Sequence, residues 1–401
     1  MFLRRQAATF VASLTGLARR LAGRGRYRDV LLHKRGLRAP SVRTRIVPDQ
    51  LPGPVDVRIA GRLLAAYRSA RWVASAATDR NDLWTTITAG QSGFIGLLEG
   101  GDPGDLARYL CNLSRHDAGR GIVQGDREYQ LIVRDASYRN AIGLMTKDKL
   151  VALAEAVGAL PVENPEQGVF GRSLYLDPDM LVAKISERIG DIAPPDIDGG
   201  LLKVMTAHGL FGERDLNAIF TAFLIRRLLG VSSNSADVCE IGAGTGRVAY
   251  WVFRNGIRNY TIFDLPHVNV VQGYYLLKGL GTESVALYDE LEPIGGGPFV
   301  KVLPSHAIRD EQTRQYDLIL NQDSFPEIHV ATVREYLLWI RQVCRGSFMS
   351  INHETRPRSS HGLIQLNVPE IVEEVGGFQR VDRFPYWLRK GYVAELYRVA
   401  R

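Results

Sequence analysis

Three glycines follow a carboxylate in the stretch Asp237–Tyr250, which reads DVCEIGAGTGRVAY. Gly242, Gly244 and Gly246 place no side chain between a ligand and the backbone, and glycine tolerates the positive φ that a tight turn requires. The stretch has the pattern of a strand, a turn and the start of a helix, whose free N–H groups carry partial positive charge. The sequence therefore predicts a ligand-binding turn with Glu240 beside it.

Two carboxylates indicate which ligand suits this turn. Nicotinamide dinucleotides use the pattern GxGxxG without an acid in front, and Glu240 would repel their pyrophosphate. S-adenosylmethionine (SAM) has no phosphate and carries a sulfonium and an ammonium group, which Glu240 attracts. The next predicted strand ends at Asp264, eighteen residues after Gly246, where a carboxylate accepts hydrogen bonds from both ribose hydroxyls. These features favour SAM as the cofactor.

The glycine turn belongs to a run of short strands and helices that begins at residue 231. The predicted strands cover residues 237–242, 259–264, 316–322, 347–352, 378–384 and 392–400. Strands that alternate with helices predict a mostly parallel sheet. No crossover helix separates the last two strands, so the last one is expected to run antiparallel. Either residues 284–288 or residues 299–304 supply the remaining strand of a Rossmann-like, seven-stranded α/β fold.

Ligands of such a sheet bind beyond the carboxyl ends of its strands. The cofactor-binding residues predicted at this rim are Glu240, Gly242, Ala243, Gly244, Gly246, Asp264, Leu265, Ser305, His306, Asn321 and Gln322. Ser305 and His306 have this role if residues 299–304 form the third strand. If residues 284–288 form it, Tyr288 and Asp289 take their place.

A hydroxyl that accepts a methyl group needs a general base, or a metal that lowers its pKa. Asp323 directly follows the strand 316–322 and is the predicted base; the alternative is that it caps a turn. His353 is the second candidate, as base or orienting group, with Glu354 beside it, unless His353 is simply solvated. An oxygen-rich Mg²⁺ site is a less favoured alternative, because its members follow no recognised ligand pattern: Asp323, Glu327, Asn352 and Glu354.

Residues 210–401 resemble the class I SAM-dependent methyltransferases, and more narrowly the bacterial sugar O-methyltransferases. The matching stretches are ERDLNAIFTAF, EIGAGTGRVAYW, YTIFDLPHVNVVQGYYL, NQDSFPE and VGGF with PYWLRKGYVAELY. The resemblance covers about half of the chain. It implies methyl transfer to a hydroxyl of a saccharide, or of a glycolipid or secondary metabolite that bears a sugar. An NAD-dependent oxidoreductase and a non-catalytic SAM-binding module are the alternatives.

The chain before this core has two parts. Residues 46–230 have apolar residues at helical spacing and predict a mostly helical region that covers the substrate. Residues 1–45 contain twelve Lys and Arg and one acid, a net charge of +11, which leaves −4 for the remainder. This tail predicts either an amphipathic helix on an anionic membrane surface or a partly disordered leader. The mild negative charge of residues 46–401 argues against nucleic-acid binding.

Composition narrows the class of protein further. No apolar run is long enough to span a bilayer. The three cysteines at positions 111, 239 and 344 are far apart in the sequence and match neither a zinc site nor a disulfide framework. These features predict a cytoplasmic protein, with contact to the inner face of the membrane if the tail docks there. The oligomeric state is left open.

Overall fold

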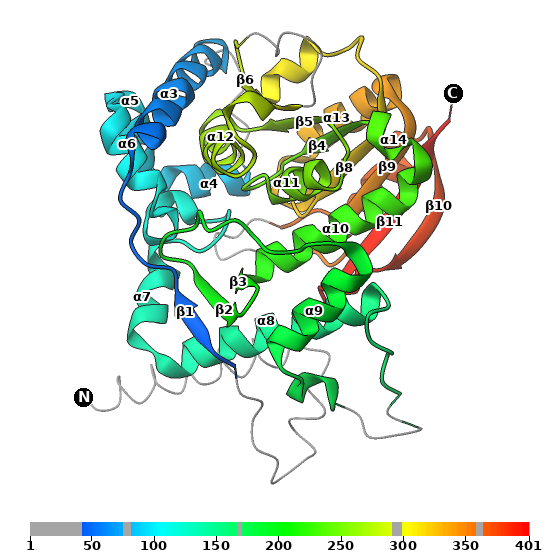
Figure 1. The fold of residues 1–401 in the computed structure, drawn as a ribbon. Coiled ribbons are helices and arrows are strands. Elements are labelled where there is room, and N and C mark those ends of the chain that lie inside the picture. The colour runs from blue at the N-terminus through cyan, green and yellow to red at the C-terminus, as the bar shows by residue number, and fades with distance from the viewer. Residues whose placement is uncertain are drawn as a thin grey trace, which may run out of the picture.

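The computed structural model describes residues 42–74, 82–164, 166, 171–290, 299–357 and 364–400. Residues 1–41, which contain the predicted amphipathic helix and most of the basic tail, lie outside the described residues. Within the described part of the chain, no helix is both long and apolar enough to cross a membrane. Figure 1 shows the arrangement of the helices and strands.

A central sheet has the strand order β10-β11-β9-β8-β4-β5-β7-β6. Its strands are β4 (Asp237–Ile241), β5 (Asn259–Asp264), β6 (Val285–Leu287), β7 (Phe299–Pro304), β8 (Tyr316–Gln322), β9 (Cys344–His353), β10 (Phe378–Pro385) and β11 (Tyr392–Val399). Along the sheet, the six neighbouring strands β9, β8, β4, β5, β7 and β6 all pair in parallel. β11 runs antiparallel between β9 and β10. The predicted mixed α/β fold with a mostly parallel sheet is confirmed.

Both candidates for the third strand are present. β7 lies beside β5, with Asp264 opposite Pro304. β6 is a three-residue strand that pairs only with β7, at the edge of the sheet. The sheet therefore has eight strands where seven were predicted, because this short edge segment adds one. The residue that follows β7 at the rim is Ser305, whereas β6 lies one strand further from the glycine turn.

Helices cover both faces of the sheet because successive side chains of a strand point to opposite sides. Val238 of β4 joins a cluster with α10 (Glu213–Leu229), α11 (Arg247–Arg254) and α12 (Pro266–Leu280). Cys239 and Ile241 join the opposite cluster, with α13 (Val330–Val343) and α14 (Val368–Val375). Parallel pairing brings the carboxyl ends of β4, β5 and β8 to one rim, where Ile241 lies opposite Phe263 and Asn321.

The chain before the central sheet forms helices and a small antiparallel sheet. The helices are α3 (Pro54–Ala74), α4 (Leu83–Ala89), α5 (Ser92–Gly100), α6 (Pro103–Leu110), α7 (Asp126–Arg134), α8 (Ala136–Ala156) and α9 (Pro178–Ile189). The small sheet, which the sequence did not predict, contains β1 (Thr44–Ile46), β2 (Leu202–Thr206) and β3 (Gly209–Phe211). Short 3-10 helices are η1 (Leu113–Arg115), η2 (Asp117–Gly119), η3 (Ser173–Tyr175), η4 (Gly230–Ser235), η5 (Thr282–Ser284), η6 (Ser305–Arg309) and η7 (Phe325–Glu327).

The N-terminal helices pack directly on the central sheet and its helices. Figure 1 shows α3 beside α12, where Asp56 accepts hydrogen bonds from Tyr274 at 3.0 Å and from Lys278 at 2.6 Å. One hydrophobic cluster runs without interruption from Ile59 of α3 to Ala394 of β11. The predicted domain boundaries after residues 45 and 230 stay predictions, because the apolar core continues across the second of them.

Candidate functional site

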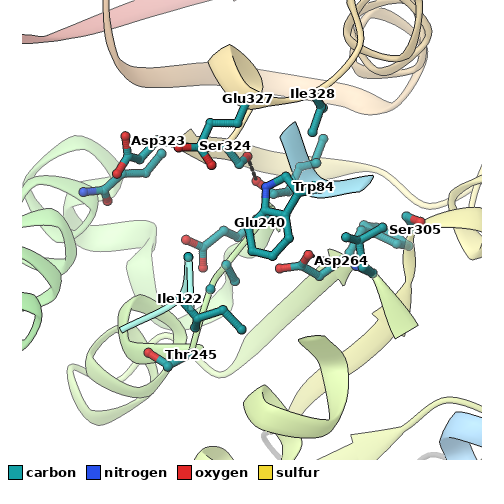
Figure 2. Close-up of a pocket in the computed structure, with 18 of the residues that line it drawn as sticks. Trp84, Ile122, Glu240, Thr245, Asp264, Ser305, Asp323, Ser324, Glu327 and Ile328 are labelled. Atoms are coloured by element: carbon teal, nitrogen blue, oxygen red, sulfur yellow. Dashed lines mark hydrogen bonds between the residues drawn. The ribbon is translucent and has the colours of Figure 1, made fainter. Parts of the chain in front are cut away.

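A cavity of about 970 Å³ opens at the carboxyl ends of β4, β5 and β8, near the upper limit for small-molecule sites. Figure 2 shows part of its lining. The predicted site residues that line it are Glu240, Gly242, Ala243, Gly244, Asp264, Leu265, Ser305, Gln322 and Asp323. The fold therefore brings most of the predicted cofactor residues, together with the predicted base, to a single cavity.

The glycine turn exposes its backbone to this cavity. Gly242, Gly244 and Gly246 have φ values of +77°, +61° and +78°, in the left-handed region that favours glycine. A Cβ on Gly242 would lie 2.2 Å from the Oγ of Ser324, so this position has no room for a side chain. A Cβ on Gly244 would meet no atom within 4 Å. Gly244 therefore leaves open the space that a ligand needs, whereas Gly246 caps α11 outside the cavity lining.

Two carboxyl groups flank the turn, one buried (Glu240) and one half-buried (Asp264). Glu240 is 2% exposed and accepts a hydrogen bond from the Tyr260 hydroxyl at 2.8 Å; burial raises its pKa to about 8. Asp264 accepts hydrogen bonds from the Leu265 N–H at 2.8 Å and the Gln272 amide at 2.6 Å, and burial raises its pKa to about 6. Among the described residues, neither carboxyl group forms an ion pair. This side of the cavity is therefore suited to a cationic ligand.

The far side of the cavity contains Asp323, which has φ of +66° directly after β8. Arg389 donates a hydrogen bond to one carboxylate oxygen, and the Tyr392 hydroxyl donates to the other at 2.5 Å. Arg214 lies 3.8 Å away. Burial alone would raise the pKa of Asp323, but the charges of Arg389 and Arg214 outweigh it and lower the pKa. Asp323 is therefore an ion-paired, weakly basic carboxylate.

Two of the predicted catalytic residues do not line the cavity. β9 continues to His353, whose ring packs edge-on against Tyr392 and whose Nδ1 lies 3.0 Å from the Thr355 carbonyl oxygen. Glu354 forms an ion pair with Arg383 of β10, with one N–O distance of 2.8 Å. Both side chains turn toward the neighbouring antiparallel strands, because the end of β9 pairs with β11. This geometry does not support a catalytic role for either residue.

Two predicted cofactor residues also lie outside the cavity lining. Asn321 is fully buried and donates a hydrogen bond to the Ile241 carbonyl at 3.0 Å, so it ties β8 to β4. His306 packs edge-on against Tyr288. Both side chains serve the packing around the rim, and the cavity is lined by their sequence neighbours Gln322 and Ser305.

The residues of the alternative magnesium site make other contacts in the structure. No group of three or more His, Cys, Asp or Glu in the described part of the chain is placed to hold a metal ion. Asn352 accepts a hydrogen bond from the Asp323 backbone N–H at 3.0 Å and donates to Asn321 at 3.0 Å, while Glu354 is paired with Arg383. The proposed ligands therefore point toward separate partners.

Several lining residues were missed by sequence reasoning. They are Asp82, Trp84, Thr85, Thr88, Gly121, Ile122, Arg214, Asn217, His267, Tyr336 and Arg389. Eight of the eleven lie within residues 46–230, three of them on α4, and Arg389 comes from the connection between β10 and β11. The sequence predicted only that residues 46–230 would cover a substrate. No local motif marks the individual side chains, since they reach the cavity through long-range packing.

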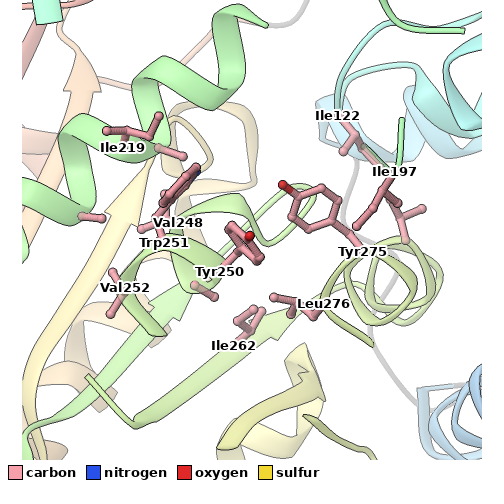
Figure 3. Packing of buried hydrophobic residues seen from close by; sticks show 14 of the residues in the cluster. Ile122, Ile197, Ile219, Val248, Tyr250, Trp251, Val252, Ile262, Tyr275 and Leu276 are labelled. Atoms are coloured by element: carbon pink, nitrogen blue, oxygen red, sulfur yellow. The ribbon is translucent and has the colours of Figure 1, made fainter. Parts of the chain in front are cut away.

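The helix after the glycine turn is held by apolar contacts on several sides. Figure 3 shows Tyr250 and Trp251 of α11 packed among side chains of α10, α12 and the N-terminal region. The rings of Tyr250 and Tyr275 meet edge-on with centroids 5.8 Å apart, a favourable aromatic arrangement. Ile197, from the loop before β2, belongs to the same cluster. The apolar core therefore fixes α11, and with it the turn.

A buried ion network adds a polar anchor to the same helix. Arg247, which directly follows Gly246, donates a hydrogen bond to Asp198 at 2.8 Å and another to Asp215 of α10. Lys203 of β2 lies 2.9 Å from Asp198 and 3.6 Å from Asp215. All four side chains are at most 8% exposed. The network therefore ties the glycine turn to the N-terminal region.

Comparison with known proteins leaves the family open. No family model matches the chain, and no curated protein matches it. Solved structures that are similar to it include the mitomycin 7-O-methyltransferase MmcR, with 17% identity over 46% of this chain and 55% of that one, at a TM-score of 0.33. They also include the CcbJ methyltransferase from Streptomyces caelestis, with 14% identity over 46% of this chain and 90% of that one, at a TM-score of 0.33.

An O-methyltransferase family protein from Burkholderia thailandensis is 12% identical over 47% of this chain and 59% of that one, at a TM-score of 0.32. This chain therefore spans less than two thirds of the length of MmcR and of the Burkholderia protein. Likenesses this weak carry no conclusion about activity. The function must be inferred from the cavity itself.

Proposed function

We propose that this protein transfers a methyl group from SAM to a hydroxyl group of a saccharide or of a small molecule that bears a sugar. The observation that carries the proposal is a pair of carboxyl groups, the buried Glu240 and the half-buried Asp264, which line the cavity beside a bare glycine turn. Neither has a cationic partner among the described residues, so a nucleoside with positive charge and without phosphate suits them.

The residues present fit SAM without rearrangement of the turn. Gly244 leaves backbone open to the cavity, Asp264 is placed to accept hydrogen bonds from ribose hydroxyls, and Glu240 is placed to attract the positively charged end. Ser305 follows β7 on the nucleoside side. When bound, SAM supplies an electrophilic methyl group, and the protein supplies alignment and exclusion of water.

The acceptor side of the cavity supports a polar, neutral substrate. The lining of the cavity includes an aromatic side chain, Trp84, together with Asn217, Gln322, Asp323 and Glu327. An aromatic face surrounded by amide and carboxyl groups suits a sugar ring, which has apolar C–H faces and hydroxyl edges. The resemblance of residues 210–401 to sugar O-methyltransferases agrees with this assignment.

Calorimetric titration with SAM, NAD and NADPH tests the cofactor. We expect heat of binding with SAM alone, because Glu240 and Asp264 disfavour a pyrophosphate and a 2′-phosphate. Binding of NAD in preference to SAM would support the oxidoreductase alternative. Binding of SAM without transfer of radiolabelled methyl groups to methyl α-D-glucopyranoside, methyl α-D-galactopyranoside or methyl α-L-rhamnopyranoside would support a non-catalytic SAM-binding module or a different acceptor.

SAM affinity is expected to increase with pH. Glu240, whose pKa in the free protein is about 8, is protonated at neutral pH, and a cationic ligand favours its ionised form. Binding therefore releases a proton, and the contribution of Glu240 to the affinity should increase by up to about tenfold per pH unit below pH 8 and level off above it. The measurement is the SAM Kd from pH 6 to 9 in the wild type and in Glu240→Gln.

The variant serves as the matched control for this pH dependence. The amino group of SAM itself titrates near pH 8, whichever protein it binds. The difference between the pH dependence of the SAM Kd in the wild type and in Glu240→Gln therefore reports the Glu240 carboxyl group alone. Parallel curves would show that Glu240 does not exchange a proton on binding.

A further inference from the structure

A second carboxyl group lies in the acceptor part of the cavity. Glu327 ends η7, which follows β8, and its side chain lines the cavity near Asp323. Figure 2 shows Asp323, Ser324 and Glu327 along the same edge of the cavity. Two carboxyl groups with different surroundings therefore face the position of the acceptor.

Their hydrogen-bond partners separate the two groups. Both oxygens of Asp323 are engaged, one by Arg389 and the other by Tyr392. Glu327 forms no ion pair within the described part of the chain, and Trp84 of α4, which lines the same cavity, lies near enough to lower its pKa as a hydrogen-bond donor. A carboxylate whose charge is neutralised by arginine binds protons weakly, whereas an unpaired one in a cavity is a stronger base.

Burial and the charges on the surrounding elements together set the pKa of Glu327. Burial and the negative charge of Asp323 raise the pKa of Glu327 to about 7, against the lowering effects of Arg214 on α10, Arg389 and the Trp84 hydrogen bond. A group with a pKa near neutrality is suited to accept a proton at physiological pH. The same neighbours, Arg389 and Arg214, lower the pKa of Asp323.

We propose that Glu327 is the general base for the acceptor hydroxyl, that Trp84 positions it, and that Asp323 holds Arg389 and Tyr392 in place. This inference rests on the proposed function. The hydroxyl proton moves to a carboxylate oxygen of Glu327, and the acceptor oxygen bonds to the methyl carbon. The electron pair of the broken carbon–sulfur bond remains on sulfur. The N-terminal region thus supplies a positioning residue, Trp84, in addition to covering the cavity.

The first test needs neither SAM nor an acceptor. The difference in tryptophan fluorescence between the wild type and Trp84→Phe isolates the emission of Trp84, which should titrate with a midpoint near pH 7. The transition should disappear in Glu327→Gln. It should move to lower pH in Asp323→Asn, because that change removes a negative neighbour and frees Arg389. A Trp84 signal that is flat between pH 5.5 and 8.5 would overturn the pairing and the proton-binding role of Glu327.

The second test follows radiolabelled methyl transfer to the three pyranosides named above. Glu327→Gln should lower kcat by about 10²–10⁴-fold while the SAM Kd stays the same. Glu327→Asp, which keeps a carboxylate, should retain a measurable rate that still increases with pH, and this guards against a fold defect in the glutamine variant. Trp84→Phe should raise the pKa of the pH–rate profile, because it removes a hydrogen bond to the ionised form.

The outcomes separate the two proposals. Loss of activity in Asp323→Asn together with near-normal rates in Glu327→Gln would overturn the assignment of the base and return it to Asp323. A wild type that binds SAM but methylates none of the pyranosides would overturn the acceptor class and the role of Glu327 as its base. A wild type that does not bind SAM would overturn the proposed function itself, and the fluorescence titration would still decide whether Trp84 and Glu327 form a titrating pair.

Discussion

Arg247→Met is expected to lower the free energy of unfolding by about 3–5 kcal/mol, the usual cost of removing one partner from a buried ion pair. The change leaves Asp198 and Asp215 with Lys203 as their remaining cation in the network, at positions that are 8% and 1% exposed. The free energy is measured by urea denaturation followed by circular dichroism. Because Arg247 begins α11, the variant should also bind SAM more weakly at temperatures where it is still folded.

Arg254→Met is the matched control, because Arg254 ends the same helix and pairs with Asp191 at 3.3 Å on the surface. Exposed pairs contribute about 0–1 kcal/mol, so this variant should unfold nearly as the wild type does. Equal losses in the two variants would show that the buried network has no special role in holding the turn.

Asp264→Ala is expected to weaken SAM binding by about 1.5–3 kcal/mol, the cost of losing hydrogen bonds to a charged acceptor. Asp264 ends β5 beside the glycine turn and lines the cavity, which places it for the ribose hydroxyls. The measurement is calorimetric titration with SAM above pH 7, where the carboxyl group is ionised because its pKa is about 6. Asp264→Asn keeps an oxygen that can accept the hydrogen bond from Gln272. This variant therefore shows the effect of losing the charge without losing that structural contact.

Asp289→Ala is the control for this experiment, because Asp289 follows the edge strand β6 and its side chain accepts a hydrogen bond from Ser69 at 2.9 Å, outside the cavity lining. The SAM Kd should not change in that variant. An effect of Asp289→Ala as large as that of Asp264→Ala would mean that the nucleoside lies at the edge of the sheet and not beside β5.

Short stretches of sequence were enough to predict the glycine turn and the two carboxyl groups beside it. The short apolar runs in residues 237–242 and 259–264 indicate buried strands, and each carboxylate was assigned by its distance from the glycines along the chain. Glycine at 242, 244 and 246 signals a turn because positive φ is a property of the single residue. These features need no information about distant parts of the chain, so the turn, Glu240 and Asp264 could be predicted together.

The third strand shows the limit of such patterns. Residues 285–287 and 299–304 are both apolar enough to be strands, and both are. Their order in the sheet depends on which one pairs with β5, and in the structure that strand is β7, while α12 packs against both. The sequence alone therefore could not say whether Ser305 or Tyr288 stands nearer the glycine turn.

The surroundings of the candidate catalytic residues became known only from the tertiary structure. Arg389 and Tyr392, which flank the start of β11, reach the two oxygens of Asp323, and the charge of Arg389 lowers its pKa. His353 lies outside the cavity because the end of β9 pairs with β11, and Trp84 reaches Glu327 from α4. The proton affinity of a carboxylate depends on its burial and on the charges around it. Those charges come from residues far apart in the chain, and only folding brings them together.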